Sequence, residues 1–184
     1  MTQDQTPLQL QRTVVLVGMM GSGKTAIGRA LSGALGVPFI DSDAAIEEAA
    51  KATIPEIFAR DGEAFFRARE MEVIDRLLSG PPCVLSTGGG AFLAAQTRAL
   101  IAQKATSLWL QVDLATLWER VRHKDTRPLL RTDDPYATLA ALLAQRTPVY
   151  AKAALHLSVK PDASIEETTA DAIALLRDAA DQKR

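Results

Sequence analysis

The fold is decided by the stretch Val14-Val15-Leu16-Val17-Gly18-Met19-Met20-Gly21-Ser22-Gly23-Lys24-Thr25. Its four leading apolar residues do not alternate with polar ones, which is typical of a strand buried on both faces of a parallel sheet. Residues 18–25 match the pattern G-x-x-x-x-G-K-[S/T], whose glycines let backbone N–H groups turn toward phosphate oxygens. The pattern predicts a triphosphate site, with Lys24 on the outer phosphates and Thr25 on Mg²⁺.

The residues around this loop decide between a phosphate site and an accidental glycine-rich turn. Apolar residues at helical spacing follow the loop from Ile27 to Leu35, and Gly36 is suited to end that helix. A buried strand before the loop and a helix after it are the context that phosphate binding requires, because the helix N-terminus attracts anions. The phosphate site is therefore the favoured interpretation.

Apolar runs alternate with helical periods along the rest of the chain, with further strands expected at residues 37–40, 83–86, 106–112 and 155–159. This alternation predicts a three-layer α/β fold with a five-stranded parallel sheet. Capping boxes at Thr53 and Ser164 predict helix starts, and Asp61-Gly62 is expected to interrupt the first of these helices. A further helix is expected to open at Asp134-Pro135 and to end before Pro148.

The composition is that of one ordinary globular domain of 184 residues. A net charge of −1 and an aromatic content of 5% disfavour nucleic acid or a membrane surface as partner. The single cysteine, Cys83, is expected to be a buried core residue. No apolar stretch reaches the length of a membrane span, and residues 1–12 are expected to form a flexible arm without a secretory signal. We expect a cytoplasmic monomer.

Two carboxylates, Asp41 and Asp43, follow the second expected strand. Residues two apart in an extended chain face the same way, so both can project from the sheet edge where ligands bind. One carboxylate could attract Mg²⁺ through water while the other accepts a hydroxyl proton from a substrate. The alternative is that Asp43 caps the following helix, and the residues alone leave both interpretations open.

Three glycines at residues 88–90 follow the third expected strand, where they could let the main chain approach a small polar ligand or form a plain flexible turn. Arg67 and Arg146 are candidate anion clamps. The alternatives are a helix-surface salt bridge of Arg67 with Glu63 or Glu70, and an ordinary surface cation at a helix end for Arg146.

A loop with room to move is predicted at residues 124–134, which are polar, charged and interrupted by Pro128. Pro128 favours an extended conformation at Arg127. An arginine on a closing loop is well suited to neutralise charge on a phosphoryl group during transfer.

Taken together, these motifs resemble the shikimate kinase family in order and spacing over most of the chain: Gly18 to Thr25, Asp41-Ser42-Asp43, Asp61-Gly62-Glu63 with Phe66-Arg67, Gly88-Gly89-Gly90, Arg127-Pro128-Leu129-Leu130 and Arg146-Thr147-Pro148-Val149-Tyr150. The resemblance implies a P-loop kinase fold similar to that of nucleoside monophosphate kinases. It also implies a substrate-binding region at about 41–79 and a mobile lid at about 120–135.

The resemblance implies transfer of the ATP γ-phosphoryl group to the 3-hydroxyl of shikimate, with one Mg²⁺, in chorismate and aromatic amino-acid biosynthesis. The implied catalytic residues are Asp43, Lys24 and Arg127, and the implied metal ligands are Thr25 and Asp41. ATP would be bound by Gly21, Ser22, Gly23, Lys24, Thr25, Ala26, Arg120 and Arg127, with Arg120 against the adenine. Shikimate would be bound by Asp43, Arg67, Gly88, Gly89, Gly90 and Arg146.

Two other function classes fit the phosphate loop alone. A gluconate-type or other small-metabolite kinase would share the loop, but it would not need the paired arginines or the glycine run. A nucleotide-dependent switch ATPase would need a partner surface, and the sequence has no patch of aromatic or apolar excess. One expected segment is also missing, because Lys160-Pro161-Asp162 offers no arginine for a second adenine contact.

Overall fold

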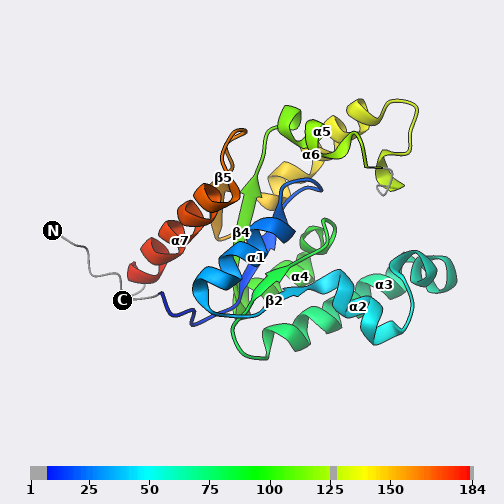
Figure 1. The fold of residues 1–184 in the computed structure, drawn as a ribbon. Coiled ribbons are helices and arrows are strands. Elements are labelled where there is room, and N and C mark those ends of the chain that lie inside the picture. Colours follow the sequence, from blue (N-terminus) through cyan, green and yellow to red (C-terminus); the bar gives the residue numbers. More distant parts are fainter. Residues whose placement is uncertain (1–7, 125–127, 183–184) are drawn as a thin grey trace.

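A computed structural model describes residues 8–124 and 128–182, and within them five parallel strands form one sheet (Figure 1). The strands are β1 (Val14–Val17), β2 (Phe39–Asp41), β3 (Val84–Ser86), β4 (Thr106–Gln111) and β5 (Leu155–Ser158), in the order β2-β3-β1-β4-β5. The predicted five-stranded parallel sheet is confirmed. The central strand β1 is buried throughout, as its unbroken apolar run predicts.

The helices cover both faces of the sheet and complete the three layers (Figure 1). They are α1 (Lys24–Leu35), α2 (Ser42–Ala50), α3 (Ile54–Leu78), α4 (Ala95–Lys104), α5 (Leu114–Val121), α6 (Pro135–Tyr150) and α7 (Ile165–Asp181), with short 3₁₀ turns at Ala91–Leu93 and Pro128–Leu130. Because parallel crossovers are right-handed, the helices that lead toward β2 and those that lead toward β5 lie on opposite faces. The helix α1, which leads toward β2, lies on one face, and α7 packs beside it after β5; α4 and α6, which lead toward β4 and β5, cover the other face.

Several local signals act as predicted. Gly36 ends α1 in the left-handed conformation, and both capping boxes are formed, at Thr53 and at Ser164. Gly62, with φ 83°, kinks α3 where the sequence predicts an interruption. Cys83 is buried in the core.

One expectation is wrong, and a second is wrong over residues 8–12, the described part of its range. The helix expected to end before Pro148 continues to Tyr150. Pro148 removes only the bond to the Ala144 carbonyl, and Ala144 is exposed, so water can replace that bond. The arm expected at residues 1–12 is packed over its described part, because Leu8 and Leu10 contact the core and Arg12 donates to the Gln103 carbonyl.

The hydrophobic core has two parts. The larger one surrounds the sheet, and a smaller cluster of Ile46, Ile57, Phe66 and Val73 joins α2 to α3. The segment that carries Asp43 and Arg67 therefore has its own packing beside the sheet. In the described residues, no helix is both long and apolar enough to cross a membrane.

Candidate active site

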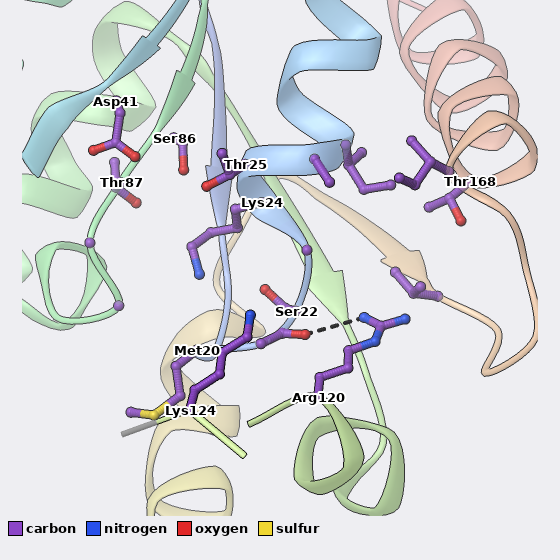
Figure 2. Close-up of a pocket in the computed structure, with 18 of the residues that line it drawn as sticks. Met20, Ser22, Lys24, Thr25, Asp41, Ser86, Thr87, Arg120, Lys124 and Thr168 are labelled. Carbon is purple, nitrogen blue, oxygen red and sulfur yellow. Dashed lines mark hydrogen bonds between the residues drawn. The ribbon is translucent and has the colours of Figure 1, made fainter. Parts of the chain in front are cut away.

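A cavity of about 570 Å³ lies at the carboxyl ends of the strands (Figure 2). It is lined by residues 20–27 of the phosphate loop and the start of α1, by Asp41 and Asp43, by residues 86–89 at the end of β3 and just after it, by Arg120 and Lys124, by Val159 after β5, and by residues 163–165 and 168 around the start of α7. The phosphate loop and the predicted carboxylates therefore share one cavity. Gly90 does not line the cavity, and neither do Arg67 and Arg146, which lie against Gly90 and Gly89 of the glycine segment.

The phosphate loop has the predicted strand–loop–helix geometry. Gly21 and Gly23 have φ angles of 80° and 92°, which side-chain-bearing residues rarely adopt. A Cβ on Gly21 would also lie 2.7 Å from the Cγ1 atom of Val121, so the loop needs glycine there on two grounds. The Lys24 ammonium donates to the carbonyl oxygens of Gly18 and Met19, at 2.9 Å each, and so lies over the loop.

The two carboxylates of the second strand have different tasks. Asp41 is the last residue of β2 and caps α2, since its Oδ1 accepts from the backbone N–H groups of Asp43 at 2.9 Å and Ala44 at 3.1 Å. The alternative in which Asp43 is the cap is therefore wrong. The expectation that both residues extend the strand is wrong too, because Asp43 lies in the first turn of α2. The turn still directs both residues to the cavity.

The environment of Asp43 disfavours its charged form. The pKa of Asp43 is raised to about 6, first by burial and then by the negative charges of Asp41, Glu70 and Glu47, while the positive charge of Lys24 opposes the shift. A carboxyl group with a pKa near neutrality, within reach of a phosphate loop, is suited to accept a proton from a hydroxyl group.

Each glycine of residues 88–90 faces a different functional side chain. A Cβ on Gly88 would lie 2.8 Å from Oδ1 of Asp43, one on Gly89 would lie 3.4 Å from Nη1 of Arg146, and one on Gly90 would lie 2.9 Å from Cζ of Arg67. A Cβ on Gly88 or Gly90 would require the Asp43 or Arg67 side chain to shift, whereas the atoms around Gly89 lie at ordinary contact distance. Three predicted site residues from α2, α3 and α6 thus meet along one short stretch of main chain.

Arg67 forms the predicted salt bridges and also faces the glycine segment, while its role as an anion clamp stays a prediction. Its Nη1 lies 2.6 Å from Oε2 of Glu70, and its Nε lies 3.7 Å from Oε1 of Glu63. Glu70 is only 1% exposed, and its burial raises its pKa while Arg67 lowers it. Glu70 therefore orients the guanidinium toward Gly90.

Arg146 and Tyr150 both reach Gly89 from the last turns of α6. The hydroxyl of Tyr150 donates to the Gly89 carbonyl oxygen at 2.7 Å, and a Cβ on Gly89 would lie 3.8 Å from that hydroxyl. Arg146 is half-buried, not the ordinary surface cation that a helix end could carry. Sequence reasoning did not single out Glu70 and Tyr150 as site residues, and their spacing of three and four from Arg67 and Arg146 is the signal that could have found them.

The cavity offers oxygen donors that fit a magnesium ion. Thr25, Asp41 and Ser86 line it, and the close-up shows the Thr25 hydroxyl on the side where Ser86 and Asp41 lie (Figure 2). Across residues 8–124 and 128–182, no three or more His, Cys, Asp and Glu side chains gather as they would in a metal cage. Mg²⁺ commonly retains water and is shared between one or two protein groups and substrate phosphates.

The structure places two of the basic residues in or near the predicted lid, Arg120 and Lys124, at the cavity. Arg120 donates from Nη1 to the Gly21 carbonyl oxygen at 3.2 Å, which ties α5 to the phosphate loop, and its predicted contact with adenine stays a prediction (Figure 2). Lys124, which sequence reasoning did not select, lines the same cavity. Arg127 lies outside the described residues.

These features define the class of the protein. The phosphate loop lies at the carboxyl end of the central strand of a five-stranded parallel sheet. Across one cavity it faces Asp43, a carboxyl group with a raised pKa, and this is the arrangement of a P-loop kinase for small molecules. The family model described as shikimate kinase matches residues 20–177, and the chain belongs to the shikimate kinase family.

Individual relatives agree with this assignment. The chain is 61% identical to the shikimate kinase of Ruegeria pomeroyi over 95% of this chain and 90% of that protein. Its fold is similar to that of the shikimate kinase from Acinetobacter baumannii in complex with shikimate, with a TM-score of 0.81, 36% identity and coverage of 92% and 94% of the two chains. A gluconokinase from Sinorhizobium meliloti is less similar, with a TM-score of 0.65, 20% identity and coverage of 95% and 97% of the two chains, and this likeness shows the fold alone.

Proposed function

We propose that this chain transfers the γ-phosphoryl group of ATP to the 3-hydroxyl of shikimate, which gives shikimate 3-phosphate and ADP for chorismate and aromatic amino-acid biosynthesis. The observation that carries the proposal is the convergence of Asp43, Arg146 and Arg67 on residues 88–90, beside the phosphate loop. Shikimate is a small acid with several hydroxyl groups. Two guanidinium groups suit its carboxylate, and one carboxylate suits its hydroxyls.

The chemistry follows from position and charge. Phosphoryl transfer needs little covalent help, so the protein mainly aligns the two substrates and neutralises charge. In this proposal, the backbone N–H groups of the loop and Lys24 hold the outer phosphates, while Asp43 accepts or orients the proton of the attacking hydroxyl. Gly89 lies between the proposed shikimate site and the phosphate loop, because a Cβ there would lie 3.9 Å from the carbonyl oxygen of Gly18.

The lid and the metal belong to the same proposal. Arg127, on the proposed lid at about 120–135, would neutralise the transferring group, and lid closure would exclude water as a competing acceptor.

Thr25 would ligate one Mg²⁺ directly and Asp41 would do so through water, and the ion would supply charge neutralisation at the phosphates. Residues 41–79 would form the shikimate-binding region, in line with the separate packing of α2 and α3. A monomeric, cytoplasmic protein remains our expectation.

Product analysis tests the activity against its rivals. ADP formation is measured with MgATP and shikimate, with MgATP and gluconate, and with MgATP alone, and shikimate 3-phosphate is identified by mass. We expect turnover with shikimate only. Turnover with gluconate would favour the other kinase class, and equal ADP formation without any acceptor would favour an ATPase.

Arg67→Ala is expected to raise the KM for shikimate by about 10- to 100-fold and to change kcat much less, because a charge-assisted contact to the substrate carboxylate is lost. The measurement is steady-state kinetics with shikimate varied at saturating ATP. Arg69→Ala is the matched control, since Arg69 pairs with Glu72 at 2.7 Å on the same helix, with the same spacing, but is exposed. An unchanged shikimate KM in Arg67→Ala would contradict the proposed role.

The pKa of Asp43 predicts the acid limb of the pH profile. Its pKa is about 6, so the carboxylate that accepts the proton is lost as the pH falls through that value. We expect kcat/KM for shikimate to fall about tenfold per pH unit below this point and to be flat above it. The profile is measured at saturating MgATP, and a plateau that extends unchanged to pH 4.5 would contradict this reading of Asp43.

A further inference from the structure

Tyr150 is a fully buried residue that none of the proposed roles uses. It has 0% exposure, lies at the end of α6 and packs near Trp109, with 6.2 Å between ring centroids. A phenylalanine could fill the same space in the core. The tyrosine differs only by its hydroxyl, which donates to the Gly89 carbonyl oxygen at 2.7 Å.

We propose that Tyr150 is a positioning residue for shikimate binding, which fixes the Gly89 main chain and the Arg146 guanidinium relative to each other. This inference rests on the proposed roles of Arg146 and Gly89. Arg146 lies one helical turn before Tyr150, so both side chains leave the same face of α6. Both also approach Gly89, as the distances of 3.4 Å and 3.8 Å from a Cβ on that glycine show.

The helix end that carries Arg146 lacks one of its own backbone hydrogen bonds. Pro148 has no N–H group, so the turn around it lacks a hydrogen bond to the Ala144 carbonyl. Tyr150 restores a connection from this turn to the loop after β3, which is 61 residues away in sequence. A buried hydroxyl without a hydrogen-bond partner is costly, so the Tyr150 hydroxyl favours the arrangement in which it reaches the Gly89 carbonyl.

Gly89 is also the central residue of the site's shared main chain. Its neighbours Gly88 and Gly90 face Asp43 and Arg67, so a rotation of the Gly89 peptide would disturb the contacts on both sides. The hydroxyl of Tyr150 holds the carbonyl of that peptide in one orientation. Loss of the hydroxyl should therefore affect the shikimate side of the site, while the phosphate loop, held through Lys24 and Arg120, keeps its geometry.

Tyr150→Phe tests the proposal, because it removes the hydroxyl and keeps the ring. We expect the KM for shikimate to rise about five- to tenfold, while the KM for ATP stays within about twofold. Shikimate should also raise the melting temperature of the variant less than that of the wild type, whereas ATP should raise both equally.

Thr13→Val is the matched control. Thr13 is 3% exposed, and its hydroxyl oxygen accepts from the Cys83 backbone N–H at 3.2 Å, just before β1 and thus at the opposite edge of the sheet. It should lower the melting temperature without changing either KM. A purely structural Tyr150 would behave in the same way, and that result would overturn the proposal.

A double-mutant cycle with Arg146→Lys provides the second measurement. If Tyr150 acts through Arg146 and Gly89, the fold-changes in shikimate KM should not multiply, and the double variant should be close to Arg146→Lys alone. Multiplying effects, equal rises in both KM values, or a Tyr150→Phe protein that is largely unfolded would each overturn the positioning role. If wild-type turnover of shikimate persists in those cases, the kinase activity itself stands.

Discussion

Asp43→Asn is expected to lower kcat with shikimate by about 10²- to 10⁴-fold, while the KM for shikimate changes only slightly. Asparagine keeps the size and hydrogen-bonding ability of the side chain but cannot take up the hydroxyl proton. In the wild type, burial and the negative charges of Asp41 and Glu70 raise the pKa of Asp43, which makes its carboxylate basic enough to take up that proton. Steady-state kinetics with both substrates varied separately measures the effect.

The stability of the same variant distinguishes a lost base from a damaged fold. The pKa of Asp43 is raised from 3.8 to about 6 on folding, so the folded state binds the proton more tightly than the unfolded state. Ionisation therefore costs the wild type stability as the pH rises from 3.8 to 6, and the cost persists above that range. Asp43→Asn removes this cost, so its melting temperature at pH 7.5 should equal or exceed that of the wild type, with the difference shrinking toward pH 4.

Glu48→Gln is the control for Asp43→Asn, because Glu48 is an exposed carboxylate on the same helix and does not line the cavity. It should leave kcat and both KM values within about twofold of the wild type. A kcat of Asp43→Asn close to that of Glu48→Gln would contradict a role of Asp43 in the chemical step.

Lys24→Met is expected to lower kcat/KM for ATP by about 10²- to 10³-fold, which is the scale for removing one charged donor from a preorganised site. Methionine keeps much of the length and apolar volume of the side chain, but it carries no ammonium group for the outer phosphates. In the folded protein this group already lies over the loop, at 2.9 Å from two of its carbonyl oxygens. Kinetics with ATP varied at saturating shikimate measures the loss.

Lys104→Met is the matched control for Lys24→Met. Lys104 is also partly buried and paired, at 2.5 Å from Oδ1 of Asp75, but it lies at the end of α4 and does not line the cavity. Its loss should lower stability and leave ATP kinetics unchanged. Equal ATP kinetics in the two variants would contradict phosphate binding by Lys24.

The local sequence predicted most of the fold because its signals act within a few residues. The run Val14–Val17, the phosphate loop and Gly36 each determine a conformation nearby, and the alternation of such segments was enough for a parallel sheet. Pro148 misled for the same reason. Its local preference ends a helix, but the contact of Tyr150 with Gly89 and the exposure of Ala144 let α6 continue.

The sequence by itself determined that this protein binds a triphosphate on a strand–loop–helix unit, and its motifs indicated the acceptor by resemblance. Only the tertiary structure decided that Asp41 caps α2 and that burial, with nearby negative charges, raises the pKa of Asp43 to about 6. It also decided that Glu70 pairs with Arg67 and that Tyr150 donates to the Gly89 carbonyl. The physical reason is that burial, charge and hydrogen bonding depend on atoms that are close in space. Asp43 faces Gly88, and Tyr150 reaches Gly89, only because strands and helices from distant parts of the chain meet at one edge of the sheet.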